Sequence, residues 1–119
     1  MSIRQSLPTE IRVSKDRRDV KFLWDDGQLL PISAELLRVM STSAEVKGHN
    51  NAERRVIGGK RDVAIEAIEH VGNYAIKIQF SDGHHTGIYT WPYLRNLGEG
   101  FDNHLSNYLD SLEKSGLAR

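Results

Sequence analysis

The sequence predicts an α+β domain in which antiparallel β-hairpins form a sheet, a short helix follows each Asp-Gly hairpin, and an amphipathic helix ends the domain. Three observations predict this fold class. Asp26-Gly27 and Asp82-Gly83 each separate two apolar runs, and Asp-Gly favours a tight hairpin because glycine readily adopts positive φ angles. Each return run leads into a helical segment that closes on Leu-Arg. Residues 101–114 carry apolar side chains at helical spacing.

The composition fits one soluble globular domain: 119 residues, 39% hydrophobic and 27% charged. We expect the domain to cover residues 8–115, with an N-terminal tail at 1–7 and a C-terminal tail at 116–119. Sixteen basic residues balance sixteen acidic ones, which argues against nucleic acid as the main ligand because no global field would hold a polyanion. The absence of cysteine excludes disulfides, thiolate catalysis and cysteine-ligated metal centres.

The sequence also predicts the cellular location of the protein. No apolar run approaches the ~20 residues that a bilayer-spanning helix needs, so we expect no membrane association. The N-terminal residues lack the apolar core of a signal peptide, and we therefore expect a cytoplasmic protein.

The elements follow from hydrophobic period and turn residues. Ser33 is placed to cap a short helix over residues 34–40, and Thr90-Trp91-Pro92 opens a second one. The pattern slips at Ala67-Ile68, which predicts a β-bulge. The predicted strands cover residues 10–13, 19–24, 28–32, 62–71 and 74–80. In the last of these, alternation places Tyr74, Ile76, Ile78 and Phe80 on one face.

Residues 41–61 have two glycine sites, few apolar side chains and no sustained period, which predicts a long surface loop. Arg54 and Arg55, with Lys60 and Arg61, make this loop locally basic. It is either a solvated loop or a docking loop for an acidic partner surface. Its glycines lack the spacing of a phosphate-binding P-loop.

The two halves of the chain echo one another. Residues 22–38 and 78–95 each read as an apolar strand, an Asp-Gly turn, a short return strand and a helical turn ending in Leu-Arg. This predicts two similar β-hairpin–helix units.

Three side chains that could take part in acid–base chemistry or metal binding lie at the second Asp-Gly turn: Asp82, His84 and His85. Adjacent strand residues point to opposite faces, so the two histidines are poorly placed to ligate one metal. Asp82 with a histidine is the only compact acid–base pair, and no nucleophile motif stands near it, so we expect no catalysis. Trp91 reads as a core anchor, or, if it is exposed, as a hot spot for a protein partner.

The motifs W-D-D-G, L-P-I-S-A-E-L-L-R and F-S-D-G-H-H-T-G-I-Y-T-W-P-Y-L-R, in this order along the chain, resemble the gamma-butyrobetaine hydroxylase-like N-terminal domain family, small bacterial domains of unknown function. In the hydroxylases this domain holds a structural zinc through three cysteines and one histidine. By position these ligands correspond to Ser41, Ser43, Val46 and His84. Serine is a poor zinc ligand and valine is none, so the resemblance implies a zinc-free version of the domain.

The hydroxylases' iron and 2-oxoglutarate site lies in a separate domain, so the resemblance implies no oxygenase activity here. Some bacterial members are fused to an Mrp/ApbC-type iron–sulfur carrier ATPase, which implies an accessory role in iron–sulfur cluster assembly. We therefore predict a non-catalytic protein-interaction domain without cofactors. Its working surface would comprise Asp82, His84, His85, Trp91, Arg54 and Arg55. The alternative is a metal- or small-ligand-binding domain centred on His84, as a degenerate zinc site.

Overall fold

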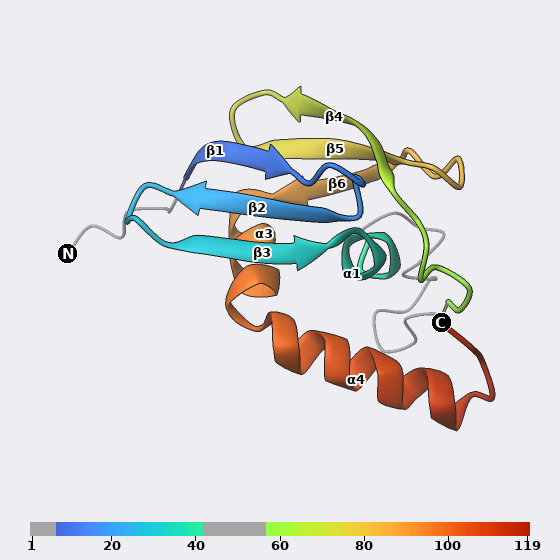
Figure 1. Cartoon of the computed structure of the whole chain (residues 1–119). Coiled ribbons are helices and arrows are strands. Elements are labelled where there is room, and N and C mark those ends of the chain that lie inside the picture. The colour runs from blue at the N-terminus through green and yellow to red at the C-terminus, as the bar shows by residue number, and fades with distance from the viewer. Residues whose placement is uncertain (1–6, 42–56) are drawn as a thin grey trace.

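The computed structural model describes residues 7–41 and 57–119, and within them the chain forms two three-stranded antiparallel sheets and three helices (Figure 1). The predicted α+β class is confirmed, but the strands make two sheets and not one. The first sheet and its helix are β1 (Pro8–Val13), β2 (Asp19–Trp24), β3 (Leu29–Ser33) and α1 (Ala34–Val39). The second sheet and the helices after it are β4 (Ile65–Val71), β5 (Ala75–Phe80), β6 (Gly87–Thr90), α3 (Trp91–Glu99) and α4 (Phe101–Lys114).

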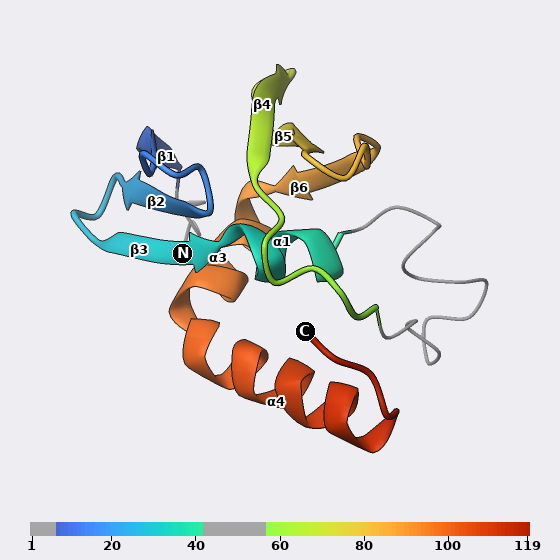
Figure 2. The ribbon, with the colours of Figure 1, turned by 45° about the vertical axis from the view of Figure 1, so that its right-hand side comes forward.

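Each sheet is a simple meander in which chain neighbours pair, in the orders β1-β2-β3 and β4-β5-β6. The apolar faces of both sheets contribute to a single core together with α1 and α3. Figure 2 shows the sheets inclined to one another, with α4 on the far side of α1 and α3. The fully buried apolar side chains of the sheets are Val20, Phe22, Trp24, Ile32, Ile65, Ala75, Ile76, Ile78, Phe80 and Tyr89. Each three-stranded sheet has one apolar face, and the two faces are buried together in this core.

The predicted repeat is visible in the hydrogen bonds. In the two Asp-Gly turns, Gly27 donates to the Trp24 carbonyl at 2.9 Å and Gly83 donates to the Phe80 carbonyl at 3.0 Å. Both glycines have positive φ angles, 89° and 93°, which the turn requires.

The helices of the two units begin in the same way. Ser33 accepts a hydrogen bond from the Leu36 amide, and Thr90 accepts one from the Tyr93 amide. These side-chain caps satisfy amides that an α-helix leaves without intrahelical partners. The two β-hairpin–helix units therefore share turn, return strand and cap.

The units are joined by reciprocal ion pairs. Arg38 at the end of α1 contacts Asp82 in the turn of the second unit, with 2.8 Å between Nε and Oδ2. Arg95 of α3 contacts Asp26 in the turn of the first unit, with 2.7 Å between Nη2 and Oδ2. Arg95 also lies over the Trp24 ring, 5.4 Å from its centroid. Each Leu-Arg of the repeat thus holds the Asp-Gly turn of the other half.

Several boundaries differ from the prediction. The bulge lies between Ile65 and Ala67, and β4 begins only at Ile65. Tyr74 is 52% exposed and does not share the inward face of β5. Its amide still bonds the Val71 carbonyl as part of the turn, so strand alternation starts one residue later. The C-terminal helix has the predicted bounds, and residues 117–119 lie back against the domain, as described below.

Trp91 is a core residue. Its side chain is 4% exposed, and its indole Nε1 donates to the Asn73 carbonyl at 2.9 Å. The exposure that a hot spot at this position would need is absent, because the first turn of α3 packs onto the end of the second sheet.

Replacing Trp91 with Ala should therefore lower the free energy of unfolding by about 3 kcal/mol or more, as for other buried aromatic truncations. Trp91→Phe should cost less, because it keeps most of the buried ring and loses only the hydrogen bond to Asn73. Urea unfolding followed by circular dichroism measures both variants. A Trp91→Ala midpoint equal to that of the wild type would contradict the core assignment.

Candidate functional site

The most distinctive buried polar contact joins the end of α1 to the turn between β5 and β6. Ser41 Oγ lies 3.0 Å from His84 Nε2. Ser41 is fully buried and His84 is 8% exposed. Ser41 and His84 are two of the four positions that, by the family resemblance, correspond to the zinc ligands of the hydroxylases. The other two, Ser43 and Val46, lie outside the described residues.

Two tyrosines of the second unit fix the end of α1. The Tyr89 hydroxyl donates to the Leu37 carbonyl, and the Tyr93 hydroxyl donates to the Met40 carbonyl. Their rings stack at 6.2 Å between centroids. Carbonyls in the last turn of a helix lack intrahelical partners, so these bonds tie α1 to the second sheet and hold Ser41 in place.

Asp82 organises the turn that carries His84. Its Oδ2 contacts Lys60 Nζ at 2.6 Å and Arg38 Nε at 2.8 Å, and its Oδ1 accepts the His84 amide at 3.1 Å. Partial burial raises the pKa of Asp82, but the hydrogen bonds from Lys60, the His84 amide and Arg38 outweigh it and lower this pKa to about 2. The carboxylate therefore binds a backbone amide and two cations.

Gly87 makes the approach of Ser41 possible. A Cβ added at this position would overlap Ser41 Oγ and press on the Tyr89 ring. The requirement for glycine here comes from close approach and not from a positive φ angle, since Gly87 is not among the positive-φ residues.

The two repeat units differ at this place. Relative to the N-cap of its own helix, Ser41 corresponds to Gly98, and Gly87 corresponds to Leu30. The equivalent contact between the units is apolar: a Cβ added at Gly98 of the second unit would lie 3.0 Å from Cβ of Leu30 in the first. The units therefore meet through Leu30 against glycine at one of the two equivalent contacts and through a buried serine–histidine pair at the other.

The turn residue itself shows the same difference. His84 corresponds to Gln28, because each follows the turn glycine and donates its amide to the turn aspartate. Gln28 is exposed, whereas His84 is buried. The imidazole is therefore turned inward at the contact where the other unit supplies a hydroxyl, that of Ser41.

The donors that residues 7–41 and 57–119 place at this site do not by themselves make a zinc site. The described residues contain no group of three or more His, Cys, Asp or Glu side chains that could hold a metal. At the site itself, the Nε2 of His84 already faces a hydroxyl, which is a weak zinc ligand. Hydrolytic chemistry fits no better, since the Ser41 hydroxyl is enclosed and Asp82 is engaged elsewhere.

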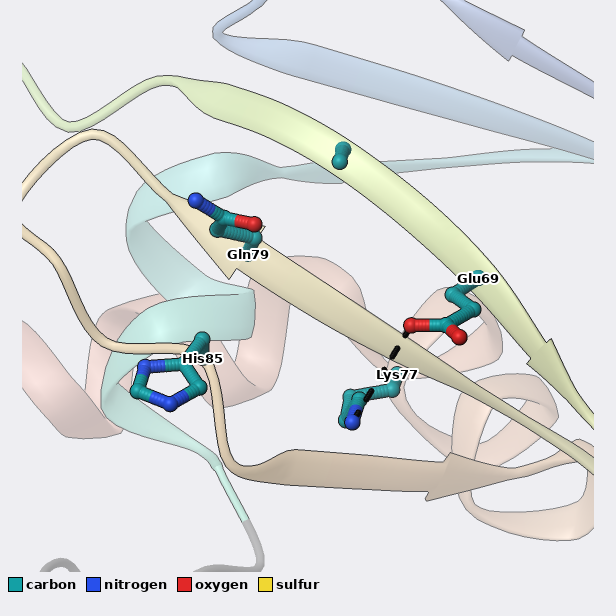
Figure 3. Close-up of a pocket in the computed structure, with 5 residues that line it drawn as sticks. Glu69, Lys77, Gln79 and His85 are labelled. Atoms are coloured by element: carbon teal, nitrogen blue, oxygen red, sulfur yellow. Dashed lines mark ion pairs between the residues drawn. The ribbon is translucent and has the colours of Figure 1, made fainter.

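The remaining predicted residues are placed as follows. His85 is exposed, and its Nδ1 lies 3.0 Å from the Gly83 carbonyl oxygen. It borders a shallow pocket of about 190 Å³ on the outer face of the second sheet, beside the Glu69–Lys77 ion pair (Figure 3). Arg54 and Arg55 lie outside the described residues. The structure therefore gathers Asp82, His84 and His85 in one turn and separates Trp91 from them.

Sequence reasoning missed the roles of Arg38, Lys60 and Gly87. The repeated Leu-Arg was a usable signal for Arg38, because the same residue closes both units. Nothing in the local pattern pointed to Lys60 or Gly87, since both act through contacts with residues far along the chain.

The fold should lose stability in acid through Asp82. Because its folded-state pKa of about 2 lies below the unfolded value of about 3.9, the carboxylate stabilises the fold above pH 4. That contribution, about 1 kcal/mol after solvent screening, is lost as the pH falls from about 4 to about 2. Urea unfolding of the wild type and Asp82→Asn across this window checks it. Equal pH dependence in the two proteins would contradict the assignment.

Comparisons with known proteins identify one family. The family model described as "Gamma-butyrobetaine hydroxylase-like, N-terminal" matches residues 11–95. A protein solved by NMR is 39% identical, with a TM-score of 0.81 over 100% of this chain and 90% of that one. A second NMR structure is 34% identical, with a TM-score of 0.82 over 97% of this chain and 90% of that chain.

A crystal structure from Acidithiobacillus ferrooxidans, of a DUF971 family protein of unknown function, is 37% identical with a TM-score of 0.64. The match covers 76% of this chain and 91% of that one. No curated protein matches the chain. Among the helices of the described residues, none is long and apolar enough to cross a membrane.

Proposed function

The chain belongs to the gamma-butyrobetaine hydroxylase-like N-terminal family, and we propose that it is a non-catalytic protein-interaction domain. Its working surface would be the β5–β6 turn around Asp82, His84 and His85, together with Lys60. The partner class is the one that the family resemblance implies, an Mrp/ApbC-type iron–sulfur carrier ATPase in the cytoplasm. The domain would serve it as an accessory module and not as a catalyst.

One observation carries the proposal: the serine–histidine pair is present in only one of two equivalent positions of the repeat. Burying polar groups costs free energy unless they are hydrogen-bonded, and an apolar contact at Gly98 and Leu30 meets the same packing need without that cost. A buried hydrogen bond instead fixes a unique conformation, here that of the turn that presents His85. A rigidly held turn is what a docking surface needs, because less entropy is lost on binding.

The enclosed Ser41 hydroxyl supports a non-catalytic role. A nucleophile must reach its substrate, and Ser41 has no exposed surface. Asp82 has a lowered pKa and is held by two cations, so it is a poor proton acceptor at neutral pH.

Affinity capture from an anaerobic extract tests the interaction. The tagged domain should retain an iron–sulfur carrier ATPase, and His85→Ala and Lys60→Ala should each reduce recovery about tenfold, the loss of a moderate interface contact. Lys21→Ala is the matched control, because Lys21 is exposed on the other sheet. Arg54→Ala/Arg55→Ala tests the basic-loop prediction in the same assay.

Trp91→Ala is unsuitable as a surface variant, because it removes a core side chain. Equal recovery from His85→Ala, Lys60→Ala and the control would remove the turn as the docking surface. Recovery of no iron–sulfur component would remove the proposed partner class.

The competing function is metal or small-ligand binding at His84, and the contact between His84 and Ser41 is the observation in its favour. We expect zinc or iron(II) to cause no measurable rise in Tm and no shift of the His84 side-chain resonances, since the described donors fall short of a metal site. The exposed His85 serves as the internal comparison. Saturable shifts at His84 with micromolar metal would favour the competing function.

A further inference from the structure

The last residues of the chain fold back from α4 onto the segment that leads into β4 (Figures 1 and 2). The Gly59 amide donates to the Ala118 carbonyl at 2.9 Å, and the Leu117 amide donates to the Leu112 carbonyl at 2.9 Å. We call residues 117–119 the strap. Its backbone is thus hydrogen-bonded both to the end of α4 and to the segment at 57–60.

The fit between strap and segment depends on glycine. A Cβ added at Gly58 would lie 2.6 Å from the Ala118 carbonyl oxygen and 3.2 Å from Leu117 Cβ. The Tyr108 hydroxyl of α4 donates to the Ile57 carbonyl of the same segment. Residues 57–59 are therefore held between α4 and the strap.

The strap also supplies the partner of a buried carboxylate. Glu35, in the first turn of α1, has a side chain that is 5% exposed, and Arg119 Nη2 lies 2.8 Å from its Oε1. A buried carboxylate is costly unless it is paired, so Glu35 favours the docked position of the strap.

Two chain segments connect the strap contacts to the candidate site. Lys60 follows Gly59 directly, and its ammonium group lies 2.6 Å from Asp82. Helix α1 carries Glu35 at its start and, one turn later, Arg38, which holds the same carboxylate at 2.8 Å. Both cations that hold Asp82 therefore stand on segments that the strap contacts.

We propose that the strap is a conformational device that keeps Lys60 and Arg38 on Asp82, so that its docking orders the turn that carries His84 and its release loosens that turn. The use of this device in partner binding rests on the proposed function. The coupling itself is a property of the free protein and is measured without a partner.

Two variants release the strap by different physics. Gly58→Ala places a methyl group against the Ala118 carbonyl, and Arg119→Ala removes the ion pair with Glu35. Lys114→Ala is the control, because Lys114 lies at the same end of α4 in an exposed ion pair with Asp110. If Arg119→Ala is too unstable to study, Glu35→Gln/Arg119→Ala removes the buried charge as well.

Amide hydrogen exchange on the full chain provides the readout. In both releasing variants the Gly59 amide should exchange faster, and the His84 amide, which donates to Asp82, should exchange about tenfold faster with it. The Val20 amide, in the first sheet, should keep its wild-type rate. Lys114→Ala should change none of the three.

The proposal is overturned if the Gly59 amide exchanges faster while the His84 amide keeps its wild-type rate, because the strap would then be released without effect on the turn. It is equally overturned if the Gly59 amide is unchanged in both variants, since the strap would not depend on the contacts assigned to it. Loss of partner capture with intact coupling would count against the proposed function alone.

Discussion

The structure depends on one constraint: each β-hairpin–helix unit has an apolar face that it cannot bury by itself. The two units bury these faces in a common core, and Trp24, Phe22, Phe80 and Tyr89 supply its bulk. Apolar burial is non-directional, so it brings the halves together without fixing how they meet. The reciprocal pairs Arg38–Asp82 and Arg95–Asp26 add direction, because each helix end must face the turn of the other unit.

This arrangement explains why the sequence suggests a reactive or ligand-binding site at an Asp-Gly turn. An aspartate before a turn glycine accepts a nearby backbone amide, and here it also receives an arginine from the other half. Asp82 therefore has three structural partners before any ligand is considered. Its lowered pKa is the result of this engagement, and a perturbed pKa is evidence of a charged network before it is evidence of catalysis.

The sequence predicted what is encoded locally. Period and caps located the strands and the helices at Ser33, Thr90 and 101–114, and the repeated motif predicted the two units. The division into two sheets was missed, because the choice between one sheet and two is made by contacts between distant strands. Tyr74 was misplaced for a related reason: alternation does not show at which residue a turn ends. The family resemblance matched Ser41 and His84 to two zinc-ligand positions, but the hydrogen-bonding contact between them and the part played by Lys60 needed the folded chain.

The difference between the two contacts that join the units supports the proposed role of the Ser41–His84 end of the molecule. The repeat creates two equivalent contacts between the units, so each contact can be compared with the other. One contact packs Leu30 of the first unit against Gly98 of the second, which needs no polar partner. The other buries the imidazole of His84 in the second unit against the hydroxyl of Ser41 in the first, and it needs Gly87 to make room. Burying a polar pair costs free energy unless the pair is hydrogen-bonded, and an apolar contact avoids that cost. In the proposed function the pair helps to define the conformation of a turn that Asp82, Lys60 and Arg38 hold and that is open to solvent at His85.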